Sequence, residues 1–160
     1  MRRSVSEVDP ADARAARVAA LDMLARRDRA AGQLLAKLTQ RGFAPETAAG
    51  VVAALVRENL INDRRYVEHF IDYHANRGNG PIKVRAELRQ SGIDAGLIDE
   101  FIAAYPDWVL RAKEVRQKKF GGGEPVDYAG KARQSRFLAY RGFTGSQIRT
   151  ALGFDVDYET

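Results

Sequence analysis

The side chains that could carry out chemistry in this chain are few, and their spacing argues against a catalytic site. The two histidines, His69 and His74, lie five residues apart, about 140° around a helix, whereas two metal ligands on one helix face are spaced by four residues. The run Gly121-Gly122-Gly123 lacks the Gly-Lys-Ser/Thr of a phosphate-binding loop. The chain contains no cysteine. We therefore expect no catalytic residue, no metal site and no cofactor.

Arginine and tyrosine side chains near residue 140 have the types and spacing of a binding surface. On a helix, Arg133, Arg136 and Tyr140 fall within about 60° of one another. Two guanidinium groups beside a phenol suit contacts with phosphates, carboxylates or nucleic-acid bases. Arg141 follows directly, and Lys83 stands 50 residues before Arg133, so both join the candidate set. The alternative is that Tyr140 packs against a neighbouring helix.

Positive charge is concentrated in the last third of the chain. The net charge is +5, and residues 107–153 contain ten Lys and Arg against four Asp and Glu. Five of these cations are spread around one predicted helix as a diffuse field: Arg111, Lys113, Arg116, Lys118 and Lys119. We include Arg116, Lys118 and Lys119 among the candidate contacts. The uneven distribution of charge along the chain suggests an anionic partner, either nucleic acid or an acidic protein surface, and the alternative is a solvated basic face. The five cations of the diffuse field are by themselves more typical of solvated side chains.

A repeat with a period of 50 residues positions these side chains. Leu38, Leu88 and Leu138 are each followed four residues later by a glycine and an apolar residue, namely Gly42-Phe43, Gly92-Ile93 and Gly142-Phe143. Each copy is typical of a helix whose last turn is closed by a glycine in the left-handed conformation. A fixed period of this size indicates stacked supersecondary units, which build extended binding surfaces.

Capping residues and prolines divide each copy into three helices, and no segment shows the alternation of a strand. Seven of the predicted helices cover about 9–27, 31–41, 81–91, 94–104, 107–119, 127–141 and 146–152, and the first of them starts at Asp9-Pro10. Two more are predicted to begin at Pro45 and at Asn62 or Asp63. In the first helix, Val18, Leu21 and Leu24 are expected to face the core. The predicted fold is therefore all-α, with three tandem three-helix repeats.

The predicted boundaries are an N-terminal extension and start of the first helix at 1–16, repeats at 17–62, 63–106 and 107–153, and an acidic tail at 154–160. A linear array of this kind is expected to be elongated. With 45% hydrophobic residues the chain can bury a core. We expect a cytoplasmic monomer without membrane contact, since the N-terminus lacks an apolar leader and the apolar run at 48–56 is too short to span a bilayer.

Three segments together resemble the RecX regulatory protein family. The central one is INDRRYV at 61–67 followed by RGNGPIKVRAELRQSGI at 77–93, and the C-terminal one is RQSRFLAYRGF at 133–143 followed by IRTAL at 148–152. The N-terminal one is ALDMLARR at 20–27 with LLAKLTQRGF at 34–43. Between these last two stretches the chain departs from the family pattern, because Asp28, Ala30 and Gln33 replace the usual Glu, Ser and Glu. Loss of the Ser is expected to weaken a helix N-cap by about 1 kcal/mol.

The resemblance implies a non-enzymatic modulator of the RecA recombinase that acts in recombination and DNA repair. Members of the family are curved arrays of three-helix repeats that lie in the groove of the RecA–DNA filament. They suppress filament growth, ATP hydrolysis and strand exchange, and they also bind DNA. The expected partners are thus the RecA filament and, more weakly, DNA. The alternative from another class is a stand-alone DNA-binding helical-repeat protein, since three-helix units can mimic helix-turn-helix modules.

Overall fold

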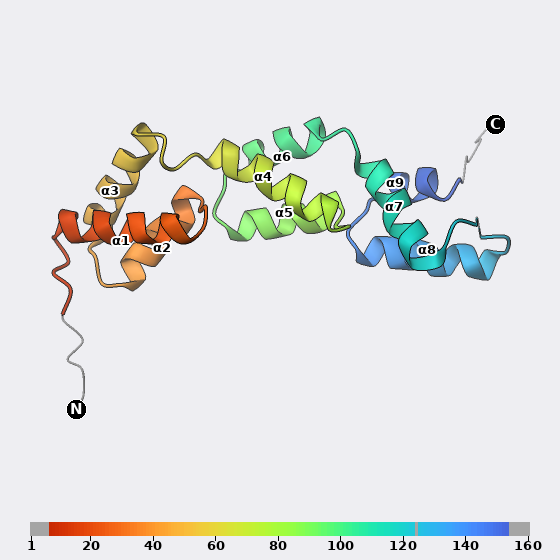
Figure 1. The fold of residues 1–160 in the computed structure, drawn as a ribbon, viewed down its shortest axis with the longest axis horizontal. Coiled ribbons are helices and arrows are strands. Elements are labelled where there is room, and N and C mark those ends of the chain that lie inside the picture. The colour runs from red at the N-terminus through yellow and green to blue at the C-terminus, as the bar shows by residue number, and fades with distance from the viewer. Residues whose placement is uncertain (1–6, 124, 154–160) are drawn as a thin grey trace, which may run out of the picture. The chain divides into compact units, whose positions relative to one another are not determined.

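The structure is a computed structural model that describes residues 7–123 and 125–153. This part of the chain forms nine α-helices and no strand, which confirms the all-α prediction (Figure 1). The chain divides into two compact units. Unit 1 contains the residues up to Tyr66 together with Ser91–Ile93, and unit 2 contains Val67–Gln90 and the residues from Asp94 onward. The acidic tail expected at 154–160 lies outside the described residues.

Unit 1 is built around the first three helices, α1 (Ala13–Arg26), α2 (Ala31–Gln40) and α3 (Pro45–Arg57). Figure 1 shows them gathered into one bundle. Its core consists of small and aliphatic side chains with one aromatic ring: Ala16, Ala20, Met23, Leu34, Leu38, Phe43, Ala48, Val51, Val52, Leu55 and Ile61. Most of these follow the three- and four-residue spacing of one helix face, so burial of that face holds the bundle together.

The buried face predicted for the first helix is wrong. Ala16, Ala20 and Met23 face the core, whereas Val18 is 61% exposed and Leu21 is also exposed. Of the three residues predicted to face the core, only Leu24 packs against it, and it is partly buried. The alanine side chains are small enough for α1 and α3 to pack closely. Alanines, rather than larger apolar residues, therefore occupy core-facing positions of α1. The predicted start is wrong too, because the side chain of Asp12, not Asp9, accepts the cap hydrogen bond from Ala15 N at 3.0 Å.

The N-cap serine that the family pattern would place before α2 is replaced by contacts from elsewhere. Ala30 has no side chain that can cap the helix. Instead, the carboxylate of Asp63 accepts a hydrogen bond of 2.8 Å from Ala31 N, and the Gln33 side chain accepts one of 3.1 Å from Ala30 N. Two of the N–H groups left over at the helix start are thus satisfied without the serine. These contacts act on the N–H groups of Ala30 and Ala31, whereas a serine side chain at the cap would accept from an N–H two or three residues later, so the loss of about 1 kcal/mol stays a prediction.

Unit 2 contains the remaining six helices, with the first turn of α4 lying in unit 1. Their bounds are α4 (Asp63–Asn76), α5 (Pro81–Gln90), α6 (Ala95–Ala104), α7 (Trp108–Phe120), α8 (Tyr128–Tyr140) and α9 (Gly145–Ala151). The side chains of Asn62, Asp94, Asp127 and Thr144 each accept a hydrogen bond from a backbone N–H three residues later and so cap α4, α6, α8 and α9. The first three agree with the helix starts predicted at 62, 94 and 127. Among the described residues, no helix has the length and apolarity needed to cross a membrane.

The repeated glycines adopt the predicted left-handed conformation. The φ angles are +103° at Gly42, +75° at Gly92 and +95° at Gly142. After the first and third of these, Phe43 N and Phe143 N donate back to the carbonyls of Leu38 and Leu138, at 3.2 and 3.1 Å. This six-to-one bond closes a helix C-terminus in the manner expected from the Leu-x-x-x-Gly-apolar pattern.

In unit 2 the end of one helix caps the start of another. Gly80 N donates to Arg141 O at 2.8 Å and Ile82 N donates to Gly142 O at 2.9 Å. The otherwise unpaired N–H groups at the start of α5 therefore meet the otherwise unpaired carbonyls at the end of α8, and the opposite helix dipole ends face each other. We call this contact the α5–α8 joint. It requires close approach, because a Cβ on Gly80 would lie 2.3 Å from Gly142 C.

Candidate partner-binding surface

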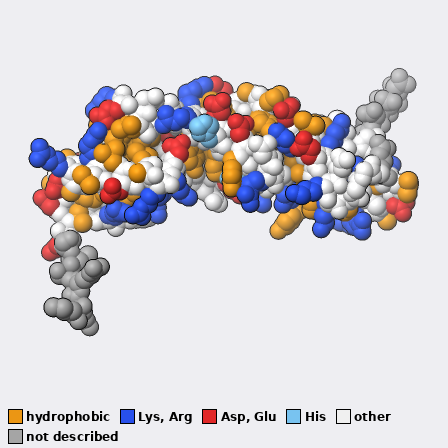
Figure 2. Space-filling model, in the orientation of Figure 1, with side chains coloured by type: hydrophobic (Ala, Val, Ile, Leu, Met, Phe, Trp, Pro, Cys, Tyr) orange, Lys and Arg blue, Asp and Glu red, His pale blue; other side chains and the backbone are white. Residues whose placement is uncertain are grey.

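The three side chains that the sequence groups on the eighth helix share an exposed face of α8. Arg133 and Arg136 are exposed, and Tyr140 is 84% exposed. On the opposite face Leu138 is fully buried and Gln134 is buried, so the helical phase predicted for α8 is confirmed. Figure 2 shows Lys and Arg side chains along the edge of unit 2 where α8 lies. The exposure of Tyr140 contradicts the alternative that this side chain packs against a neighbouring helix.

An aromatic pair between α7 and α8 holds two of the candidate cations. The rings of Phe120 and Phe137 meet edge to face, with centroids 5.3 Å apart. The guanidinium carbon of Arg133 lies 5.2 Å from the Phe120 centroid, and Lys119 Nζ lies 5.9 Å from the Phe137 centroid. Contacts of this kind attract a cation to the ring face and limit its orientations. Arg133 and Lys119 are thus positioned on the surface rather than simply solvated.

Arg116 is not the exposed contact that its place in the basic field suggested. It is 8% exposed, its Nε donates to Gln134 Oε1 at 2.7 Å, and its Nη2 donates to the carbonyl of Gly123. The guanidinium links α7, α8 and the glycine-rich loop between them. Its partners account for the burial, because a buried charge needs hydrogen bonds to offset the loss of water. We therefore assign Arg116 to the core of unit 2 and remove it from the contact surface.

Arg141 also has a structural partner. Its Nε donates to Gly78 O at 3.1 Å and its Nη2 donates to Arg77 O at 2.9 Å. These carbonyls lie just beyond α4, so the guanidinium closes the C-terminus of a helix from which it is distant in sequence and complements its dipole. Lys83 is half-buried, and its backbone packs against Gly142 at the α5–α8 joint. Both residues therefore stabilise unit 2 beside the surface formed by α8.

A cavity of about 550 Å³ opens beside Arg141. Its polar lining comes from Asn76, Arg77, Glu114, Lys118, Lys119 and Arg141, and its apolar lining includes Ala75, Val115 and Phe137. Lys118 and Lys119 are exposed, and the Glu114 carboxylate pairs with Arg111 at 2.9 Å. Four cations thus surround one hollow between α4, α7 and α8, which gives it a positive potential.

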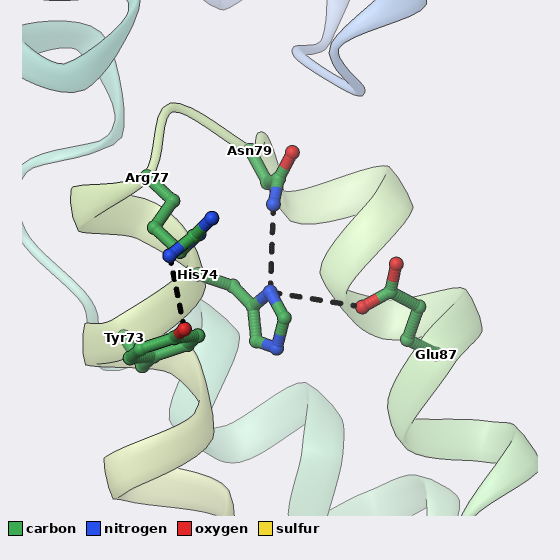
Figure 3. A network of polar contacts seen from close by, with 5 residues as sticks. All are labelled: Tyr73, His74, Arg77, Asn79 and Glu87. Atoms are coloured by element: carbon green, nitrogen blue, oxygen red, sulfur yellow. Dashed lines mark hydrogen bonds and ion pairs between the residues drawn. The ribbon is translucent and has the colours of Figure 1, made fainter.

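A polar network surrounds His74 at the end of α4 (Figure 3). His74 Nδ1 lies 3.4 Å from the Asn79 side-chain amide and 3.8 Å from Glu87 Oε2, and its ring stacks at 4.1 Å on Phe70. Burial lowers the pKa of His74, and the carboxylate of Glu87 opposes this shift. His69 does not share this environment, since it is exposed. No group of three or more His, Asp or Glu side chains in the described ranges could hold a metal ion.

Three residues that line the cavity beside Arg141 were not predicted from the sequence, namely Arg77, Phe137 and Gly78. Arg77 donates to the Tyr73 hydroxyl at 3.0 Å and lines the cavity. Gly78 has φ +86°, and a Cβ there would lie 2.7 Å from the guanidinium of Arg141. Arg77 and Gly78 occur in the segment that resembles the family signature, but nothing in their own spacing connects them with Phe137 about 60 residues later. Only the fold brings these residues together.

These features define a class of protein: an all-α tandem three-helix repeat with an exposed basic and aromatic surface on one helix. Family models match all three repeats, with the first RecX three-helix domain at residues 16–55, the second at 62–102 and the third at 110–152. The chain belongs to the RecX family. It is 42% identical over 138 residues to a regulatory protein RecX of Halorhodospira halophila, covering 86% of both chains.

Other relatives and solved structures agree with this assignment. A regulatory protein RecX of Pseudomonas entomophila is 44% identical over 135 residues, covering 84% of this chain and 87% of the relative. The fold is similar to a crystal structure of RecX from Lactobacillus salivarius, with a TM-score of 0.79 and 20% identity over 89% of this chain and 95% of the other. A second crystal structure, of a regulatory protein RecX, has a TM-score of 0.73. A regulatory role follows from the family.

Proposed function

We propose that this chain is a non-enzymatic regulator that binds the RecA–DNA filament and reduces its growth, ATP hydrolysis and strand exchange in recombination and DNA repair. Its membership in the RecX family supports a regulatory role. The exposed face formed by Arg133, Arg136 and Tyr140 supports binding to a partner whose surface is anionic, or is anionic in part and apolar in part. This face is special to the third repeat, because the positions aligned with Arg136 and Tyr140 are Ala36 and Gln40 in the first repeat.

The α8 face is the observation that carries the proposal. Arg133 is oriented by the Phe120 ring, Arg136 lies one helical turn before Tyr140, and all three project from one rigid helix. Arginine pairs bidentately with carboxylates and phosphates, and a desolvated tyrosine adds contact area at little entropic cost. Lys118 and Lys119 extend the positive field from α7, which favours fast association with an anionic partner.

The test is inhibition of ATP hydrolysis by RecA assembled on single-stranded DNA. Replacing Arg133 and Arg136 by Glu reverses two positive charges on exposed side chains, so we expect the concentration needed for half-inhibition to rise tenfold or more. The matched control is Arg89→Glu with Lys113→Glu, which makes the same change of charge on exposed residues of unit 2 outside α8 and should leave the half-inhibition concentration unchanged. Equal inhibition by the α8 variant and the parent would remove the α8 face from the proposal.

A pull-down separates this proposal from a stand-alone DNA-binding protein. Filament assembled on DNA and bare DNA are compared at equal phosphate concentration and equal ionic strength, because salt alone changes both interactions. We expect recovery of the chain mainly with the filament. Equal recovery with bare DNA would favour the stand-alone function.

A further inference from the structure

The helix ends at Gly42, Gly92 and Gly142 share a left-handed backbone but differ in what covers them. At the α5–α8 joint the start of α5 covers Gly142, because a Cβ added there would lie 2.5 Å from Lys83 Cβ. In unit 1 the start of α2 covers Gly92, because a Cβ added on Gly32 would lie 3.3 Å from Gly92 O. These two ends thus each receive the start of the second helix of the preceding repeat.

In the third repeat this end consists of residues 141–143, Arg-Gly-Phe, which we call the third-repeat RGF corner. The guanidinium of Arg141 donates to the carbonyls of Arg77 and Gly78. The carbonyl of Arg141 accepts a hydrogen bond of 2.8 Å from Gly80 N. The corner therefore binds the turn between α4 and α5 from both sides, since its cation meets the end of α4 and its carbonyl meets the start of α5.

The first repeat contains a corner of the same backbone geometry with an open surface. Residues 41–43 are again Arg-Gly-Phe, and φ and ψ are −77° and −5° at Arg41 against −74° and −6° at Arg141. Arg41 and Gly42 are exposed, whereas Gly142 is buried. Among the described residues, the nearest atom to a Cβ added on Gly42 is Val8 Cβ, at 3.7 Å. This first-repeat RGF corner has the backbone that binds a turn, and its outer surface is accessible.

Unit 2 contains a turn that matches this corner. Gly121, which ends α7, has a φ of +86°, the value that Gly78 has after α4. A Cβ on Gly78 would lie 2.7 Å from the Arg141 guanidinium, whereas a Cβ on Gly121, Gly122 or Gly123 meets no atom within 4 Å in the described part of the chain. All three of these glycines are exposed. The α7–α8 turn at 121–123 therefore presents the backbone conformation that an RGF corner binds.

We infer that the first-repeat RGF corner of one chain binds the α7–α8 turn of a second copy, with the Arg41 guanidinium donating to the carbonyls of Phe120 and Gly121. These carbonyls correspond to the two that Arg141 binds after α4. The lysines that end α7 do not prevent this contact, since Arg141 binds beside the cation of Arg77. Because the two surfaces differ, a pair of copies leaves one of each unoccupied, and further copies add head to tail.

The contact is small, because it joins one helix end to one turn. A stable interface buries about 1,600 Å², so the dilute chain stays a monomer, and the contact forms where copies are held close together. The inference goes beyond the proposed function, since it concerns binding between copies of this chain in the absence of RecA.

Disulfide cross-linking between two variants of the full chain tests this arrangement. The chain has no cysteine, so Gln40→Cys beside the corner and Gly122→Cys in the turn each introduce a single thiol. The two variants, one carrying an affinity tag, are mixed at roughly physiological salt with copper phenanthroline as the oxidant. We expect the 40–122 cross-link to form about tenfold faster than the 40–40 and 122–122 cross-links, because only the mixed pair meets in a head-to-tail contact.

Arg41→Ala in the Gln40→Cys chain should slow the 40–122 cross-link about tenfold, as expected for the loss of a charge-assisted hydrogen bond. The matched control is Arg57→Ala, which removes the same charge from an exposed arginine of unit 1 and should leave the rate unchanged. Lys113→Cys in place of Gly122→Cys controls for random collision, since Lys113 is exposed in unit 2 outside the turn. Circular dichroism verifies that each variant keeps the helix content of the parent.

Any of four results would overturn the inference. Equal rates for the 40–122 and 40–113 cross-links would indicate random collision. A 40–40 or 122–122 cross-link faster than the mixed one would indicate a symmetric dimer. Equal rates for Arg41→Ala and Arg57→Ala would remove the corner from the contact. A chain with both cysteines that cross-links mainly within itself would assign the contact to a single chain.

Discussion

His74 shows how one residue can link protonation to the stability of unit 2. Its Nδ1 can accept a hydrogen bond from the amide of Asn79 only while that nitrogen is unprotonated. Glu87 favours the charged ring, whereas burial and the neighbouring Arg77 and Lys83 favour the neutral one, and burial dominates. The pKa of His74 in the folded chain therefore lies below its ordinary value.

Because the pKa of His74 is lowered in the folded chain, the stability of unit 2 is expected to decrease at acidic pH. Between the lowered pKa of folded His74 and its ordinary value in the unfolded chain, the unfolded state binds more protons, so the free energy of unfolding falls as the pH drops through that window. We expect the urea midpoint of unit 2, followed by the fluorescence of the single tryptophan Trp108, to decrease from pH 7 to pH 5. His74→Gln should flatten this decrease.

His69→Gln is the matched control, because His69 lies on the same helix but is exposed. It should retain the pH dependence of the parent chain. If both histidine variants follow the parent, the environment of His74 does not contribute to the pH dependence, and the carboxylates of unit 2 must account for it.

At the scale of the helices, the glycine that follows α8 does more than end a helix. Gly142 has φ +95°, and its carbonyl accepts the hydrogen bond from Ile82 N at the α5–α8 joint. An added Cβ would lie 2.5 Å from Lys83 Cβ and 2.8 Å from Lys83 N. Any side chain at this position must therefore push the start of α5 away from the end of α8.

Gly142→Ala is expected to destabilise unit 2 more than Gly121→Ala does. Both glycines have a positive φ, which costs a residue with a Cβ roughly 1 kcal/mol or more, and the ψ of −179° at Gly121 places it in a region that almost only glycine occupies. A Cβ at Gly121 meets no atom within 4 Å, so this variant measures the cost of the backbone conformation alone. For a unit of this size 1 kcal/mol corresponds to a Tm shift of about 4–8 °C.

Thermal melts followed by Trp108 fluorescence make the comparison within one unit. We expect the Tm of Gly142→Ala to fall further than that of Gly121→Ala, because only the first variant also disrupts the α5–α8 joint. Equal shifts would mean that the α5–α8 joint relaxes without cost, and unchanged melting of both variants would contradict the role of the positive φ angles.

Local chemistry explains which features of the helices could be predicted from the sequence. The helix ends at Gly42, Gly92 and Gly142 depend on the conformational freedom of one residue, so the pattern predicts them without the fold. The buried face of α1 depends on how closely α3 approaches, and Ala16 and Ala20 permit that approach, which helical periodicity alone does not indicate.

The same distinction separates the parts of the site. The exposed face of α8 follows from helical periodicity around Leu138, which is why Arg133, Arg136 and Tyr140 were predicted together. The burial of Arg116 depends on Gln134, 18 residues away, and the position of Arg141 depends on carbonyls 63 and 64 residues away. Such contacts carry no periodic signal, so the sequence alone identifies the charge but not its partner.

For the whole molecule, the 50-residue repeat predicts an elongated shape. In a linear array each repeat contacts only its neighbours, so the chain is expected to be longer than a globule of equal mass. A compact domain of 160 residues has a radius of gyration of roughly 15 Å. Small-angle X-ray scattering should therefore give a radius of gyration clearly larger than this. The forward scattering, measured over a dilution series, verifies that the protein is a monomer.

Elongation also bears on how the chain would engage a filament. If the first and third repeats contact different protomers, the second contact becomes intramolecular and benefits from a high effective concentration. Placing Glu at both Arg133 and Arg136 should then cost much more affinity for the filament than for an isolated RecA protomer, which offers only one contact. Equal losses for both partners would exclude bridging, and a radius of gyration near 15 Å would contradict the extended array on which bridging depends.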